Sequence, residues 1–157
     1  MLVNMLNERN ENVSLLDLGD LPEGYFSTRM YDVRIPEFQS LIDEKIAAAH
    51  GFIFVVPEYN GSIPGVLKLF IDTIPMPMFR EKYAGIVGLS DGRAGNLRGQ
   101  DHLTAVLHHL KMHVHYHKPK LSGITKSFDE QGNFTQAAYK ELLEEHVALM
   151  IEYAGKG

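Results

Sequence analysis

The sequence predicts an α/β domain built on a doubly wound parallel sheet. Apolar strand-like runs alternate with segments of helical periodicity along the 157 residues, which is the pattern of such sheets. The run at 51–56 (Gly-Phe-Ile-Phe-Val-Val) is apolar on both faces, as expected for a parallel strand that helices cover on both sides. Hydrophobic residues make up 45% of the chain, enough for one core. We therefore expect residues 1–157 to form a single domain.

The predicted elements follow from periodicity and from helix start and stop signals. Pro36 opens a helix, because its fixed φ suits a first helical turn, and Pro75 and Pro77 end another. Thr135 is the expected N-cap of the last helix. In order, the expected elements are a helix at 1–10, a strand at 12–18, a turn-rich loop at 19–35, a helix at 36–49, a strand at 51–56, a helix at 64–73, a strand at 83–89, a helix at 97–111, a strand at 113–121 and a helix at 135–153.

Composition excludes several classes of function. The formal net charge is -5, which leaves no basic surface for nucleic acid. The chain has no cysteine, so disulfides and thiol redox chemistry are excluded, and electron transfer would need a bound cofactor. The apolar runs are too short to cross a bilayer, and no signal sequence is recognisable. We expect a cytoplasmic protein with neither a membrane nor a nucleic acid as partner.

Two polar, glycine-containing loops directly follow predicted strands. The first is Pro-Glu-Tyr-Asn-Gly-Ser-Ile-Pro-Gly-Val-Leu-Lys at 57–68, with Ile71 and Asp72 in the helix behind it. The second is Ser-Asp-Gly-Arg-Ala-Gly-Asn at 90–96. Because the carboxyl ends of parallel strands lie at one edge of a sheet, both loops are expected where open α/β proteins bind ligands.

The first loop closely resembles the flavin-ring loop of the NAD(P)H-dependent FMN reductase family, which includes quinone, chromate and azo-dye reductases. The second resembles the family's other ring-facing turn, with Asn96 where a second glycine is common. The resemblance implies a flavodoxin-like fold of three layers. It also implies hydride transfer from NAD(P)H through bound FMN to a quinone, azo or similar acceptor, with no dedicated catalytic residue. The implied cofactor contacts are Pro57, Glu58, Tyr59, Asn60, Gly61, Ser62, Ser90, Gly92, Arg93 and Gly95.

The start of the chain departs from the family pattern. Relatives begin with an apolar strand and a phosphate-binding loop, and this sequence starts within what resembles the following helix. We expect the first strand to be absent, which would weaken FMN binding because the phosphate anchor is lost. The alternative hypothesis is a shortened flavodoxin-like protein that does not bind FMN and acts as an oligomeric or interaction module.

Several assignments remain open at this level. The sequence does not distinguish NADH from NADPH, because no basic residue can be assigned to the ribose phosphate of NADPH and the candidates are Arg80, Arg93 and Arg98. We interpret His102 as a surface or interface residue. We expect a homodimer or homotetramer, because members of the family commonly dimerise around the helix after the first loop. The apolar segment at 75–79 beside Leu67, Phe70 and Ile71 suits such an interface.

Three histidines alternate along the last predicted strand. His113, His115 and His117 should therefore share one face. They would suit zinc or nickel, but a polar edge strand is the simpler interpretation, and we predict no metal site.

Overall fold

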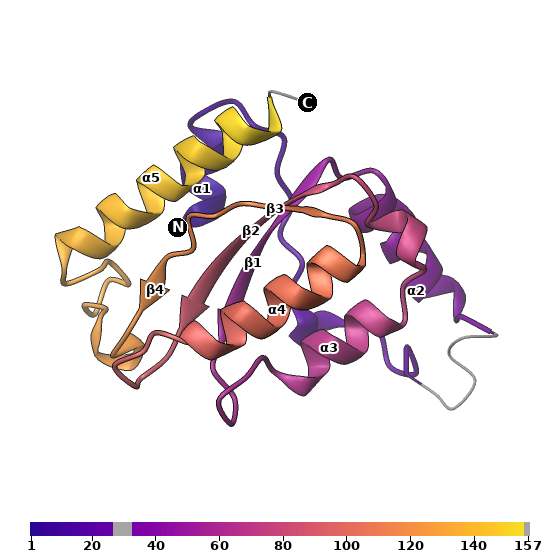
Figure 1. Ribbon diagram of the computed structural model, residues 1–157, viewed down its shortest axis with the longest axis horizontal. Coiled ribbons are helices and arrows are strands. Elements are labelled where there is room, and N and C mark those ends of the chain that lie inside the picture. The colour runs from indigo at the N-terminus through magenta and orange to yellow at the C-terminus, as the bar shows by residue number, and fades with distance from the viewer. Residues whose placement is uncertain (27–32, 156–157) are drawn as a thin grey trace.

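The computed structural model describes residues 1–26 and 33–155 (Figure 1), so part of the predicted loop at 19–35 lies outside the described residues. The strands are β1 (Gly51–Pro57), β2 (Tyr83–Leu89), β3 (His113–Val114) and β4 (Lys120–Leu121). The α-helices are α1 (Leu2–Asn7), α2 (Pro36–Leu41), α3 (Gly65–Asp72), α4 (Leu97–His109) and α5 (Ala137–Ala154). Other helical segments are η1 (Leu18–Asp20), η2 (Ile42–Ala47), η3 (Met76–Met78) and η4 (Ile124–Lys126).

The sheet is parallel and centres on β2. β1 pairs with β2 along its whole length, from Gly51 opposite Tyr83 to Pro57 opposite Leu89. β3 pairs with the beginning of β2 and β4 with its end. The carboxyl ends of β1, β2 and β4 consequently meet at one edge of the sheet, as the predicted fold class requires.

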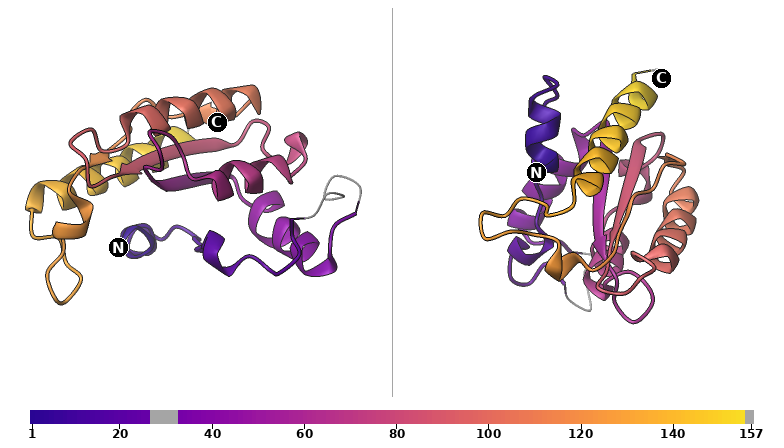
Figure 2. Two further views of the ribbon diagram at one scale, coloured as in Figure 1. Left: turned by 90° about the horizontal axis from the view of Figure 1, so that it is seen from below. Right: turned by 90° about the vertical axis from the view of Figure 1, so that its left-hand side faces the viewer.

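Helices cover both faces of the sheet and give the three predicted layers. Figure 2 shows α1 and α5 on one side of the strands and α4 on the other. On the α4 side, Val56, Ala84 and Ile86 join a core with α2 and α3. On the α5 side, Val87 joins a smaller core. Successive residues of β2 therefore serve different cores, because side chains alternate along a strand.

β1 and β2 have similar apolar sequences but different burial. Five consecutive residues of β2 are buried, whereas Val56 is the one buried residue of β1. Val55 is 49% exposed. The prediction that helices cover β1 on both faces is therefore wrong in part. Within the described residues β1 pairs only with β2 and lies at the edge of the sheet, so fewer neighbours cover it.

The predicted strand at 12–18 does not form. This segment has no regular structure up to Asp17 and then enters η1. Leu16 and Leu18 pack against the larger core, while Leu15 is exposed. The apolar pattern therefore correctly predicted that the segment packs against the core, but the predicted strand was wrong. A strand also needs a neighbouring backbone with which to form hydrogen bonds.

The predicted strand at 113–121 is divided into β3 and β4. Tyr83 lies opposite His113, and Gly88 lies opposite Lys120. The segment between β3 and β4 therefore contains two residues more than the stretch of β2 beside it. The intervening segment bulges, and Tyr116 is 79% exposed. A bulge re-aims side chains and ends regular pairing, so one long strand was the wrong prediction.

The helix ends also differ from expectation. Thr135 does not cap the last helix, since α5 begins after Gln136 and the amide of Thr135 bonds to the carbonyl of Ser127 instead (N···O 2.9 Å). The helix that Pro36 opens continues beyond α2 as the π-helical segment η2. None of the helices in the described part of the chain is long and apolar enough to cross a membrane.

Candidate functional site

The first predicted loop, from Pro57 to Ser62, leaves β1 and folds into a tight turn. Asn60 and Gly61 have φ angles of 51° and 73°. The backbone groups of Tyr59 and Ser62 exchange two hydrogen bonds, with N···O distances of 3.0 and 2.9 Å. This is the type I′ arrangement, for which Asn-Gly is a preferred pair. The turn leaves Tyr59 projecting from the edge of the sheet, 59% exposed.

The second predicted loop leaves β2 at Ser90. Ser90 is buried, and its hydroxyl donates to the carbonyl of Gly92 (O···O 2.8 Å). Gly95 has a φ of 56°. A Cβ at this position would also lie 2.7 Å from the Cβ of Lys120. Glycine is therefore required here both by the backbone conformation and by the close approach of the neighbouring chain.

The two loops adjoin at the carboxyl edge of the sheet. The amide of Glu58 donates to the carbonyl of Leu89 (N···O 2.8 Å), so the first loop begins beside the end of β2. The side chain of Asn96 is completely buried and donates from Nδ2 to the carbonyl of Val56 (2.9 Å). Its Oδ1 accepts from the amide of Gly99 (3.1 Å). The structure thus places the predicted residues of both loops on one edge of the sheet.

Two residues of α4 reach the first loop, and sequence reasoning did not place them there. His102 Nδ1 lies 2.8 Å from Ser62 Oγ. The Arg98 guanidinium lies over Gly61 and 3.6 Å from the Glu58 carboxylate. The spacing of four residues between Arg98 and His102 was the available signal, because it puts both side chains on one face of a helix.

The loops offer unused backbone donors, and the space beside Gly92 is open. The amides of Asn60, Gly61, Gly92 and Arg93 donate no hydrogen bond within the described part of the chain. A Cβ on Gly92 would meet only Ser90 Oγ, at 3.8 Å. Free N–H groups beside unfilled space suit a flat ring with carbonyl and nitrogen acceptors along its edge. The residues present therefore fit an isoalloxazine ring.

Known proteins identify the family. The sequence profile of the family described as NADPH-dependent FMN reductase matches residues 1–120. The chain belongs to this FMN reductase family. An NAD(P)H-dependent FMN reductase of Pseudomonas aeruginosa is 33% identical over 141 residues, which cover 87% of this chain and 75% of the relative. A 2-hydroxy-1,4-benzoquinone reductase of Burkholderia sp. is 36% identical over 99 residues, which cover 60% of this chain and 52% of the relative.

Among solved structures, a flavoenzyme NAD(P)H:(acceptor) oxidoreductase of Paracoccus denitrificans has the same fold. Its TM-score is 0.81 at 23% identity, and the match covers 99% of this chain and 86% of that chain. The predicted flavodoxin-like fold is thereby confirmed. Family membership confirms the predicted enzyme class, an oxidoreductase that uses FMN and NAD(P)H. The individual ring contacts and the weakened binding of FMN stay predictions.

Two histidines of the last predicted strand, His115 and His117, pack beneath α5 of this FMN reductase homologue. The rings of His115 and His117 both neighbour His146 of α5, and the Nδ1 atoms of His117 and His146 are 3.4 Å apart. Burial, together with the nearby His117 and His115 rings, lowers the pKa of His146 to about 4. His113 instead pairs with Glu81 at 3.1 Å. Among the residues that the structure describes, no three His, Asp or Glu side chains are arranged to hold a metal ion.

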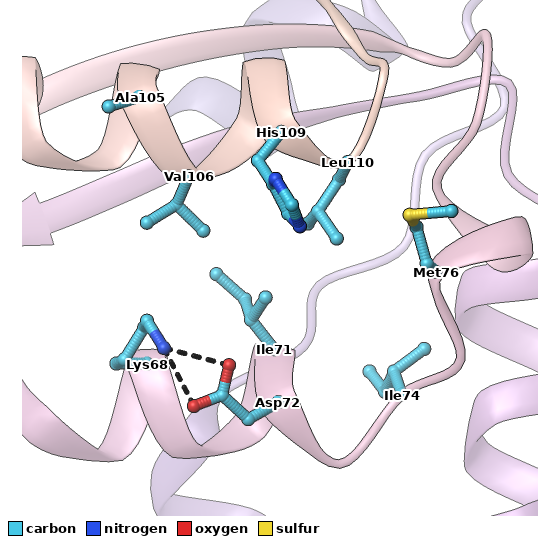
Figure 3. Close-up of a pocket in the computed structure, with 9 residues that line it drawn as sticks. All are labelled: Lys68, Ile71, Asp72, Ile74, Met76, Ala105, Val106, His109 and Leu110. Carbon is cyan, nitrogen blue, oxygen red and sulfur yellow. Dashed lines mark hydrogen bonds and ion pairs between the residues drawn. The ribbon is translucent and has the colours of Figure 1, made fainter.

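A groove of about 520 Å³ lies between α3 and α4, away from the predicted ring contacts (Figure 3). The side chains drawn in Figure 3 line it, and they are Lys68, Ile71, Asp72, Ile74, Met76, Ala105, Val106, His109 and Leu110. Leu67, Phe70 and Ile71, which we predicted beside an intersubunit patch, are buried in the chain's own core. Ile71 also lines the groove, and the interface at the segment 75–79 stays a prediction.

Proposed function

We propose that this protein is an NAD(P)H-dependent flavin oxidoreductase that reduces a quinone, an azo compound or a similar acceptor. The observation that carries the proposal is the pair of adjoining loops at the carboxyl edge of the sheet, which carry four free amides among the described residues and leave open space beside Gly92. The acceptor class is supported by relatives that are named as a benzoquinone reductase and an azoreductase.

The chain's own part in this reaction is to hold and orient the cofactor. Bound FMN supplies the chemistry, because it accepts a hydride, two electrons and one proton, from NAD(P)H and passes the electrons to the acceptor. The free amides of Asn60, Gly61, Gly92 and Arg93 would donate to the ring edge, where negative charge grows on reduction. The full set that we assign to the flavin is Pro57, Glu58, Tyr59, Asn60, Gly61, Ser62, Ser90, Gly92, Arg93 and Gly95.

The Arg98–Glu58 pair sets the charge beside the first loop. Arg98 lies 3.6 Å from the Glu58 carboxylate across the turn and partly offsets its charge, so the carboxylate repels less strongly a ring that becomes more negative on reduction. Ser62 is held by His102. In this arrangement the side chains hold the loop, and its backbone amides remain free for the cofactor.

A Gly92→Val variant tests the proposal most directly. A Cβ at this position would meet only Ser90 Oγ, at 3.8 Å, so the fold should tolerate a side chain here, yet that side chain would fill the space that we assign to the ring. We expect the wild-type protein to oxidise NAD(P)H with added FMN and 1,4-benzoquinone, and the variant to lose at least about tenfold in kcat/KM.

The matched control is Lys140→Ala, which changes an exposed side chain of α5. Equal thermal unfolding temperatures for both variants would show that Gly92→Val acts on the site. Wild-type activity in Gly92→Val would contradict the assigned site. A wild-type protein that neither binds flavin nor oxidises NAD(P)H would favour the alternative, a shortened flavodoxin-like interaction module.

We also propose that the protein forms a homodimer through the groove between α3 and α4. Ile74, Met76, Val106 and Leu110 give it an apolar lining, which suits burial against a second copy. Sedimentation velocity of Val106→Asp should then give a monomer, whereas a monomeric wild-type protein would contradict the proposal. The cytoplasmic location stays a prediction.

A further inference from the structure

Asn96 occupies an unusual position at the start of α4. Its φ and ψ angles are 63° and 37°, in the left-handed region, and none of its surface is exposed. Residues with a Cβ carry a cost in this region, and asparagine is among those that tolerate it. A buried side-chain amide in this conformation therefore needs compensating bonds.

Both ends of the Asn96 amide are bonded, and they reach different elements. Nδ2 donates to the carbonyl of Val56 (2.9 Å), which precedes the first loop. Oδ1 accepts from the amide of Gly99 (3.1 Å) in the first turn of α4. Glycine is needed at 99, because a Cβ there would collide with the Asn96 carboxamide. The side chain thus joins the end of β1 to the helix that follows the second loop.

Among the described residues, the backbone bond from the Glu58 amide to the Leu89 carbonyl also joins the ends of β1 and β2, and Asn96 provides the one buried side-chain hydrogen bond between β1 and α4. Arg98–Glu58 and Ser62–His102 also link the first loop to α4, but both pairs lie at the surface. Water and ions weaken exposed contacts of this kind. The hydrogen bond to Val56 is shielded from both.

We propose that Asn96 is a positioning residue that fixes the spacing between the two loops of the flavin site. This inference rests on the proposed function. By holding the end of β1 against α4, Asn96 keeps the amides of Asn60 and Gly61 in register with those of Gly92 and Arg93. A flat ring that spans both loops then binds without first ordering them.

Two variants and one control separate this role from simple stability. Asn96→Gly keeps a backbone that favours positive φ and removes both bonds, while Asn96→Asp retains the acceptor for Gly99 but cannot donate to Val56. Gln100→Met removes another buried side-chain amide, which donates to the carbonyl of Pro119 just before β4 and makes no bond to β1 in the described structure. Flavin fluorescence would give the Kd of each protein for FMN and for riboflavin, which has the ring without the phosphate.

We expect Asn96→Gly and Asn96→Asp to raise both Kd values about tenfold, as for the loss of one buried hydrogen bond. The absorption band of the bound flavin should shift toward that of free flavin in both variants. Gln100→Met should change Kd by less than twofold and leave the band unchanged. Unchanged affinity in Asn96→Gly, or an equal loss in Gln100→Met, would overturn the proposal.

A second readout needs no flavin. Hydrogen–deuterium exchange should be faster in both loops of Asn96→Gly than in the wild type, and unchanged there in Gln100→Met. If the wild type binds neither flavin, the proposed function fails, and exchange still decides the role of Asn96. Unchanged exchange in the loops of Asn96→Gly would overturn it.

Discussion

Two helices rest on opposite faces of β2, and polar side chains of different kinds anchor them. On the α4 face, the buried amides of Asn96 and Gln100 are bonded to backbone carbonyls. On the α5 face, the anchor is the buried imidazole of His146, whose Nε2 has no hydrogen-bond partner among the described residues. Amides do not titrate and imidazoles do. Acid should therefore loosen the α5 face and leave the anchors of α4 intact.

Acidification is the strongest way to test this difference. A histidine has a pKa of 6.5 in the unfolded chain, and burial lowers the pKa of His146 to about 4. Between these values the unfolded chain binds more protons. Stability from this group is therefore complete above pH 6.5 and is lost as the pH falls toward 4. We expect a loss of about 3 kcal/mol in the free energy of unfolding, measured by urea denaturation across this range.

A His146→Leu variant isolates the contribution of this group. Its free energy of unfolding should fall about 3 kcal/mol less than that of the wild type over the same pH range. His108→Leu, which changes an exposed histidine of α4, should keep the wild-type pH dependence. If His146→Leu also keeps it, the imidazole does not account for the acid sensitivity of the α5 face.

Two glycines of β2 leave room for the buried side chains of His146 and Gln100. Substituting these glycines should give the next largest loss in the free energy of unfolding. A Cβ on Gly85 would lie 2.7 Å from His146 Nε2. A Cβ on Gly88 would lie 2.8 Å from Gln100 Nε2 and closer still to the carbonyl of Gly95. Overpacking of this kind costs about 1 to 3 kcal/mol. We expect Gly88→Ala to be the more destabilising in urea, because a backbone carbonyl yields less readily than a side chain, and the reverse order would contradict this.

Removal of the Gln100 amide should have a smaller effect that does not depend on pH. Gln100→Leu leaves the buried carbonyl of Pro119 without its side-chain donor, and we expect a loss of about 1 to 2 kcal/mol. Urea denaturation should give the same loss at pH 7 and at pH 5. A loss that grows at pH 5 would remove the distinction between the two anchors.

The smallest expected effect is at the surface of the site. Arg98 and Glu58 are 3.6 Å apart and the Arg98 side chain is largely exposed, so Arg98→Ala should change the free energy of unfolding by less than about 0.5 kcal/mol. High salt should reduce even this difference. A change above 1 kcal/mol would mean that surface contacts, rather than Asn96, hold the first loop.

The predictions that succeeded depend on short stretches of sequence. Asn60-Gly61 forms a turn that its own residue types favour, and both loops follow apolar runs that pair as parallel strands. The failures involve neighbours distant in sequence. In the part of the chain that the structure describes, the apolar segment at 12–18 has no strand partner, and the segment at 113–121 divides because it meets β2 in two registers.

Sequence alone determined the family, the α/β class and the two glycine-containing loops, because each depends on residue types at close spacing. Tertiary structure alone decided which buried polar groups meet. Asn96 bonds to Val56, which is 40 residues away in the sequence, and His146 contacts His117, which is 29 residues away. The physical reason is that a hydrogen bond depends on distances of about 3 Å in space, and only the packing of α4 and α5 on β2 brings such residues together.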